Sequence, residues 1–193
     1  IMNKSVYDTP KNKEDVNRHI LTILVDNEPG VLARVIGMFS GRGYNIDSLN
    51  VAEVNNEHLS RITIVTHGTT EVINQIQSQI MRIIPVHSVI NLDEEDSSVE
   101  AEVALVYMHV NKKNKKKSFQ ICDLYRARKI ENENNSIIFE IAGTSERIDT
   151  FIKDISEVTD IEIVRSGPVA ISSVNRNEEE SWEFIMIGMQ TLI

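Results

Sequence analysis

The sequence predicts an α+β protein with two ferredoxin-like βαββαβ domains in tandem, and three observations support this. Short runs rich in Ile, Leu and Val alternate with segments whose apolar residues recur every three or four positions, as on one face of a helix. This pattern of elements begins again in the second half of the chain. In addition, the stretch GTTEVINQIQSQI from Gly68 aligns with GTSERIDTFIKDI from Gly143, which indicates an internal repeat.

The first unit begins with a strand over residues 19–25 (HILTILV), because this apolar run is too short for a helix before Pro29. A helix over residues 31–40 follows, and Gly41 and Gly43 end it. The apolar face of this helix carries Leu32, Val35, Ile36 and Phe39.

A hairpin, a second helix and a last strand complete the first unit. The strands of the hairpin cover residues 46–54 and 59–66. The second helix ends at Pro85, before a strand over residues 86–92. Its apolar face carries Ile73, Ile76, Ile80 and Ile83. A unit with this order closes as a four-stranded antiparallel sheet with both helices on one face.

The second unit is predicted to contain strands over residues 103–110, 136–142 and 161–164. A short helix lies after the first of these strands, and its apolar face carries Ile121, Leu124 and Tyr125. A longer helix precedes the last strand, and its apolar face carries Ile148, Phe151, Ile152 and Ile155.

The acidic stretch over residues 92–100 has no periodicity, so we interpret it as a linker. The predicted domains therefore cover residues 18–93 and 100–174. Residues 1–17 and 175–193 are predicted to be flexible tails.

Composition excludes several classes of function. The formal net charge of −9 repels nucleic acid and anionic membranes, and we interpret the one basic cluster, residues 112–117 (KKNKKK), as a solvated loop. No apolar run approaches the roughly 20 residues that cross a bilayer, and the N-terminus lacks a signal peptide. The five histidines are too scattered for a metal site. We therefore expect a cytoplasmic protein with no nucleic-acid or membrane partner, and the single Cys122 agrees with a reducing compartment.

The segment DNEPG, residues 26–30, is the candidate binding site. The helix after it starts with no hydroxyl or carboxylate cap beside it, so its first N–H groups are free and carry partial positive charge that suits a carboxylate. Gly30 lets a ligand approach the backbone, and Asn27 and Asn45 offer amides for an ammonium or carboxylate group. The second unit lacks this segment, which favours a binding site. The alternative is that both asparagines only cap turns.

Two long stretches resemble one family. RHILTILVDNEPGVLARVIGMFSGRGYNIDSLNVAEV, followed by LSRITIVT, is similar to the N-terminal ACT domain of the regulatory (small) subunits of acetolactate synthase. FEIAGTSERIDTFI and VRSGPVAISS resemble the C-terminal domain of that family. The resemblance covers residues 18–173, and only the KKNKKK segment and the C-terminal tail depart from the family pattern.

The resemblance implies a non-catalytic subunit that binds and activates a catalytic large subunit and makes it sensitive to feedback by valine or a related branched-chain amino acid. It also implies a homodimer through the ACT domain, with the effector between the two copies. The implied effector-binding residues are Asn27, Gly30, Val31 and Leu32 of one chain and Asn45 and Ile46 of the other. No cofactor is expected in this chain, whereas thiamine diphosphate, Mg and FAD are expected on the catalytic subunit.

Other functions fit the sequence less well. RNA-recognition modules share the βαββαβ order but stack bases on aromatic side chains, which the strands at residues 19–25 and 59–66 lack. An enzyme needs a convergent acid, base or nucleophile, which the spacing does not supply. An ACT-type amino-acid sensor serving another enzyme or regulator stays open as an alternative. For the tail with Trp182, docking on the protein, contact with a partner and disorder all stay open.

Overall fold

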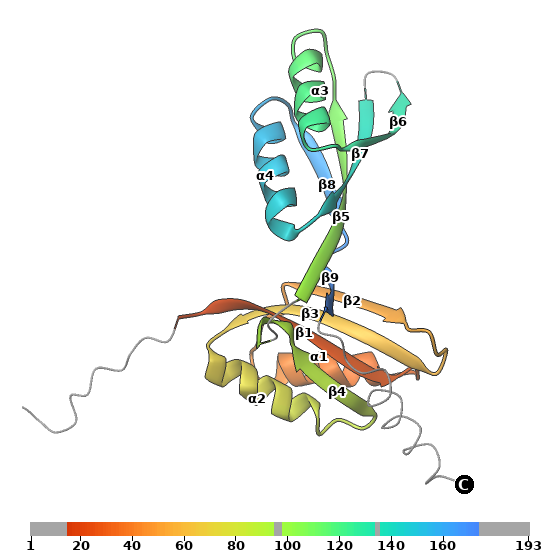
Figure 1. The fold of residues 1–193 in the computed structure, drawn as a ribbon, viewed down its shortest axis with the longest axis vertical. Helices are drawn as coiled ribbons and strands as arrows, with labels where there is room; N and C mark the ends of the chain where they lie inside the picture. Colours follow the sequence, from red (N-terminus) through yellow and green to blue (C-terminus); the bar gives the residue numbers. More distant parts are fainter. Residues whose placement is uncertain (1–14, 95–97, 134–135, 174–193) are drawn as a thin grey trace, which may run out of the picture.

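The computed structural model describes residues 15–94, 98–133 and 136–173, which form two α+β units (Figure 1). The N-terminal unit consists of β1 (Asn17–Asp26), α1 (Val31–Gly41), β2 (Ser48–Glu53), β3 (Leu59–Gly68), α2 (Thr70–Ile80) and β4 (Val86–Asn91). The 3₁₀ helix η1 (Leu92–Glu94) follows. The C-terminal unit consists of β5 (Ser98–His109), α3 (Lys115–Leu124), β6 (Arg128–Glu133), β7 (Ser136–Gly143), α4 (Ser145–Ser156), β8 (Ile161–Arg165) and β9 (Val169–Ser172). The predicted fold class is confirmed.

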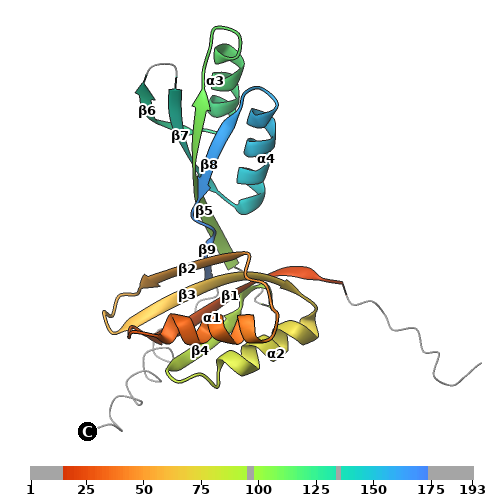
Figure 2. The same cartoon turned by 180° about the vertical axis from the view of Figure 1, so that it is seen from behind.

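The N-terminal sheet is antiparallel, with the strand order β2-β3-β1-β4. Helices α1 and α2 cover one of its faces (Figure 2). Alternate residues of β1 point to this side, so Leu21, Ile23 and Val25 are buried under the helices. From α2, Ile73, Ile76 and Ile80 are buried as their spacing predicts. The helix ends at Ile80, several residues before Pro85, and Ile83 packs on the core from the following turn.

The C-terminal sheet has the strand order β6-β7-β5-β8, and its helices α3 and α4 also lie on one face. The internal repeat is confirmed at equivalent helix starts. Thr69 is the N-cap of α2 and accepts a hydrogen bond from the Val72 backbone N–H at 3.4 Å. Thr144 is the N-cap of α4 and accepts one from the Arg147 N–H at 3.3 Å. None of the helices in the described parts of the chain is long and apolar enough to span a bilayer.

Several details of the C-terminal unit differ from the prediction, and β9 also has no predicted counterpart. Strand β6 was not predicted, because its sequence RKIENE lacks apolar alternation and the strand pairs only with β7 at the sheet edge. The second half of the KKNKKK segment forms the exposed first turn of α3 instead of a loop. Leu124 is 74% exposed, because the buried face of α3 carries Ser118 and Cys122.

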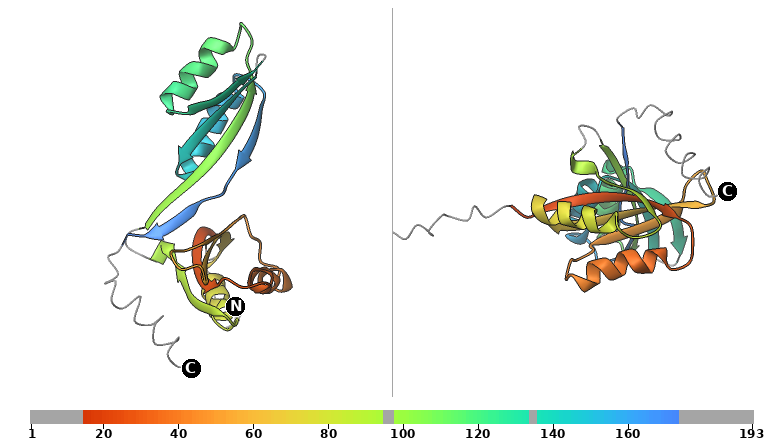
Figure 3. Two further views of the ribbon diagram at one scale, coloured as in Figure 1. Left: turned by 90° about the vertical axis from the view of Figure 1, so that its right-hand side faces the viewer. Right: turned by 90° about the horizontal axis from the view of Figure 1, so that it is seen from below.

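Strand β5 connects the two units. It starts at Ser98, within the stretch predicted to be a linker, because β9 supplies hydrogen-bond partners for its first residues. The rest of β5 pairs with β7 and β8. The ribbon of β5 and β9 lies on the face of the N-terminal sheet opposite the helices (Figure 3). There Ala170 packs with Ile20, Val65 and Leu92 in a small apolar cluster.

Candidate functional site

The start of α1 lies directly after β1, in the DNEPG segment. Gly30 is the N-cap residue, with φ 91° and ψ −10°, and no side chain caps the helix. This left-handed conformation favours glycine. A β-carbon at Gly30 would find no atom within 4 Å, so open space lies in front of the helix start. The first turn of α1 contains no acidic residue, so nothing on the helix itself compensates the partial positive charge there.

The first backbone N–H groups of α1 are weakly paired. The Val31 N–H reaches the Glu28 carbonyl only at 3.5 Å, whereas the Arg34 N–H makes a regular bond to the Gly30 carbonyl at 3.1 Å. Among the residues that the structure describes, none accepts a hydrogen bond from the N–H of Leu32. The side chain of Val31 is 2% exposed, so this residue can offer a ligand only its backbone N–H. The geometry suits an anionic group.

Asn27 fixes the DNEPG segment to the turn between β2 and β3. Its Nδ2 donates to Glu53 Oε1 at 3.0 Å and to the Glu57 carbonyl at 2.9 Å, and its backbone N–H donates to the His58 carbonyl at 2.7 Å. Asn27 therefore does cap the turn between β2 and β3, through its side-chain nitrogen. Its Oδ1 has no hydrogen-bond donor among the described residues, so it can accept a hydrogen bond from a ligand.

Asn45 and Ile46 lie beyond the other end of α1. Asn45 Nδ2 donates to Asp47 Oδ1 at 2.6 Å, and the Asn45 carbonyl accepts a hydrogen bond from Thr66 Oγ1 at 2.6 Å. Ile46 is half-buried and packs on the apolar core. Because α1 has 11 residues, its length of about 16 Å separates these two residues from Gly30 within one chain. The structure thus brings Asn27, Gly30, Val31 and Leu32 together, but not with Asn45 and Ile46.

Sequence spacing did not predict the contact between Asp47 and His67, which lies beside Asn45. Asp47 Oδ2 lies 2.6 Å from His67 Nδ1; Asp47 directly precedes β2, and His67 lies near the end of β3. Only the pairing of β2 with β3 brings them together, since His67 and Asp47 are 20 residues apart in sequence. No group of three or more potential metal ligands occurs within residues 15–94, 98–133 and 136–173.

Comparison with known proteins assigns both units to one family. Residues 21–88 match the family model described as "AHAS small subunit-like ACT domain", and residues 101–174 match "Small subunit of acetolactate synthase". The chain is 34% identical to the acetolactate synthase small subunit of Haemophilus influenzae, covering 83% of this chain and 98% of that one. The chain belongs to the small subunits of acetolactate synthase.

Further acetolactate synthase small subunits agree with this assignment. The chain is 38% identical to the isozyme 3 small subunit of Escherichia coli, covering 80% of this chain and 95% of that one. A crystal structure of the small subunit from Thermotoga maritima superimposes with a TM-score of 0.74 at 31% identity, covering 83% of this chain and 99% of that one. As a member of the family, the chain is a non-catalytic regulatory subunit with an N-terminal ACT domain, and it associates with a catalytic large subunit. The predicted family is confirmed.

Proposed function

We propose that this small subunit activates its thiamine-diphosphate-dependent catalytic subunit and makes it sensitive to valine or a related branched-chain amino acid. Family membership over both units supports activation. The start of α1 supports the effector site, because it combines weakly paired N–H groups, no acidic residue in the first helical turn and open space in front of Gly30. These properties fit the carboxylate that every free amino acid carries.

The proposed site is completed by a second copy of the chain. Within one chain the α1 start and the segment of Asn45 and Ile46 lie at opposite ends of a helix about 16 Å long, too far apart for one small amino acid to contact both. In the proposed homodimer, the α1 start of one ACT domain faces Asn45 and Ile46 of its mate. The half-buried side chains of Leu32 and Ile46 then offer apolar contacts to an aliphatic effector.

Asn27 Oδ1 is proposed to accept a hydrogen bond from the ammonium group of the effector. The chemistry of the reaction stays on the catalytic subunit, where we expect thiamine diphosphate, Mg and FAD. A cytoplasmic location belongs to the same proposal, and the free, buried thiol of Cys122 agrees with it.

The test is reconstitution with the purified catalytic subunit. Acetolactate formation from pyruvate is measured for each chain alone and for the mixture, with and without valine, leucine or isoleucine. We expect no turnover by this chain alone, faster turnover by the mixture, and inhibition of the mixture by at least one of the three amino acids. Activation without any inhibition would overturn the effector proposal, and no activation would favour an ACT-type sensor that serves another enzyme.

Sedimentation tests the homodimer independently. A dimer at micromolar concentration is expected, since a half-site cannot enclose a ligand. A monomer both with and without valine contradicts the shared site.

A further inference from the structure

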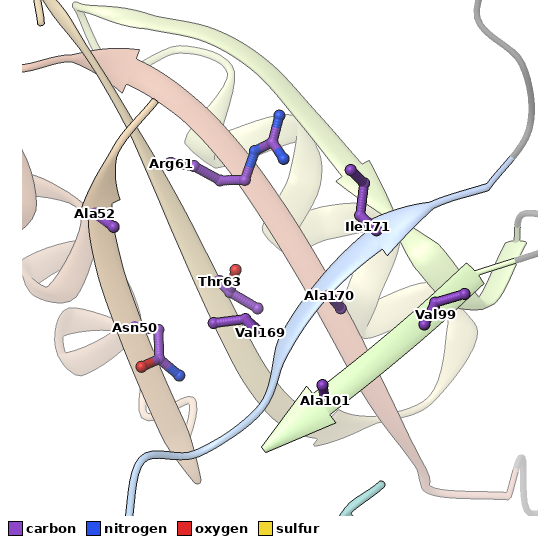
Figure 4. Close-up of a pocket in the computed structure, with 9 residues that line it drawn as sticks. All are labelled: Asn50, Ala52, Arg61, Thr63, Val99, Ala101, Val169, Ala170 and Ile171. Atoms are coloured by element: carbon purple, nitrogen blue, oxygen red, sulfur yellow. The ribbon is translucent and has the colours of Figure 1, made fainter. Parts of the chain in front are cut away.

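An apolar groove lies between the two units (Figure 4). It has a volume of about 300 Å³, with β2 and β3 on one side and the ribbon of β5 and β9 on the other. The ribbon pairs Val99 with Ile171 and Ala101 with Val169, so all four side chains lie on the same face, toward the groove.

The larger side chains of this face are well exposed to solvent. Val99, Val169 and Ile171 are 57%, 55% and 56% exposed. Soluble proteins rarely leave several neighbouring large apolar side chains uncovered without a binding partner. A contact that covers this face of the ribbon is therefore favoured by the hydrophobic effect.

The opposite side of the groove carries a positive charge. Arg61 of β3 lines the groove, and it forms no ion pair with any residue in the described parts of the chain. An occupant that combines apolar side chains with acidic residues would therefore match both sides of the groove.

The chain itself contains such a segment directly after β9. Residues 174–193, which lie outside the described residues, contain Glu178, Glu179 and Glu180 close to the apolar run of residues 182–189 (WEFIMIGM). The match to the family model ends at residue 174, so this segment is an addition to the matched part of the chain. An extended chain of about ten residues reaches roughly 35 Å, which lets residues 182–189 return to the groove that Ile171 lines.

We propose that residues 182–189 occupy this groove of their own chain, with the acidic residues 178–180 beside Arg61. Apolar side chains of the run cover Val99, Val169 and Ile171, and the glutamates neutralise the guanidinium. Tethering supports an intramolecular occupant, because covalent attachment through a short link gives an effective concentration in the millimolar range. A separate partner of equal affinity would have to be present at a similar concentration to displace the tethered segment.

Trp182 provides the measurement, because it is the only tryptophan of the chain. The fluorescence of the full-length chain is recorded alone, over a range of protein concentrations. We expect emission at the short wavelengths of a buried indole and poor quenching by acrylamide, both independent of concentration. Ile171→Lys is expected to shift the emission to longer wavelengths and to increase quenching, because it places a charge in the groove.

Ile130→Lys is the matched control. Ile130 is 46% exposed on β6, away from the groove, and the same substitution there should leave the emission unchanged. Arg61→Glu should increase quenching, whereas Arg61→Lys should not. Emission of a solvated indole in the chain alone, or a buried indole that Ile171→Lys does not move, overturns the proposal. A blue shift that appears only at high concentration or only with the catalytic subunit also overturns it, since Trp182 would then bind another chain.

Discussion

Gly167, between β8 and β9, lies directly against Ser48 of β2. A β-carbon on residue 167 would overlap the Ser48 hydroxyl group, and Gly167 also has a positive φ of 72°. The carbonyl of the next residue, Pro168, accepts a hydrogen bond from Asn50 Nδ2 at 3.0 Å. The C-terminal unit therefore rests on β2 through a backbone contact that only glycine permits.

Replacing Gly167 by alanine should destabilise the protein by about 2 kcal/mol or more, because the new methyl group adds a clash to an unfavourable backbone conformation. Urea unfolding measures the change. Gly37→Ala is the matched control, since no atom lies within 4 Å of a β-carbon there and the residue lies inside α1. It should stabilise the protein by about 0.5–1 kcal/mol. Equal midpoints for Gly167→Ala and the wild type would contradict the contact.

Gly30→Asp should strongly weaken inhibition by the effector while activation persists. A carboxylate about 4 Å from that of the effector repels it by about 1 kcal/mol in water and about 4 kcal/mol in a partly buried site, which weakens binding at least about fivefold. Gly30→Asn is the matched control, because Asn and Asp both tolerate a positive φ better than other side chains. The asparagine variant should keep more of the inhibition. Reconstituted activity with increasing valine measures both; equal inhibition curves for the two variants would mean that charge at this position does not matter.

The buried carboxyl group of Glu102 should make stability depend on acid pH. It accepts hydrogen bonds from Arg165 Nε at 2.6 Å and Nη2 at 2.8 Å, and from Ser145 Oγ at 3.0 Å. The Arg165 guanidinium is the main cause that lowers the pKa of Glu102 in the folded protein, against a smaller opposing effect of burial. Because the folded pKa is below the unfolded one, the stabilisation is complete above the unfolded pKa and is lost as the pH falls through the folded pKa.

We therefore expect the free energy of unfolding to fall from about pH 5 downwards, and less steeply in Glu102→Gln than in the wild type. The substitution itself should cost roughly 1–3 kcal/mol at pH 7, since it removes the buried ionic partner of Arg165 and leaves only the exposed Asp149 paired with it. Thermal or urea unfolding at several pH values provides the data. Glu162→Gln, at an exposed position of β8, serves as the control. Parallel pH profiles for wild type and Glu102→Gln would show that Glu102 does not cause the loss of stability in acid.

The two copies of the repeat should respond alike to removal of their helix caps. Thr69→Ala and Thr144→Ala each delete a side-chain oxygen that accepts from the first turn, so each should destabilise its unit by about 1 kcal/mol. Denaturant unfolding measures both changes. Replacement by serine keeps the capping oxygen and should recover most of the loss. A large effect in one copy and none in the other would show that the two copies do not depend equally on their helix caps.

The sequence predicts the first unit better than the second, for physical reasons. Apolar periodicity identifies elements with one buried face, such as α2 with Ile73, Ile76 and Ile80. It misses β6, whose sequence RKIENE keeps no apolar pattern, and it misses β9, which forms only because β5 pairs with it. The uncapped N-terminus of α1 is predicted by the DNEPG segment alone. The pair of Asp47 and His67 does not, because sheet pairing brings the two residues together.

Strand β5 gives the two units a common mechanical element. Its 12 residues span about 40 Å, and the same strand is hydrogen-bonded to β9 over the N-terminal sheet and to β7 and β8 in the C-terminal sheet. A bend within residues 98–101 would break ladder hydrogen bonds to β9, and a bend within residues 102–109 would break those to β7 and β8. We therefore expect a tilt of the ACT sheet to be transmitted along β5 to the C-terminal unit. The displacement should be largest at the end of that unit farthest from the ACT sheet.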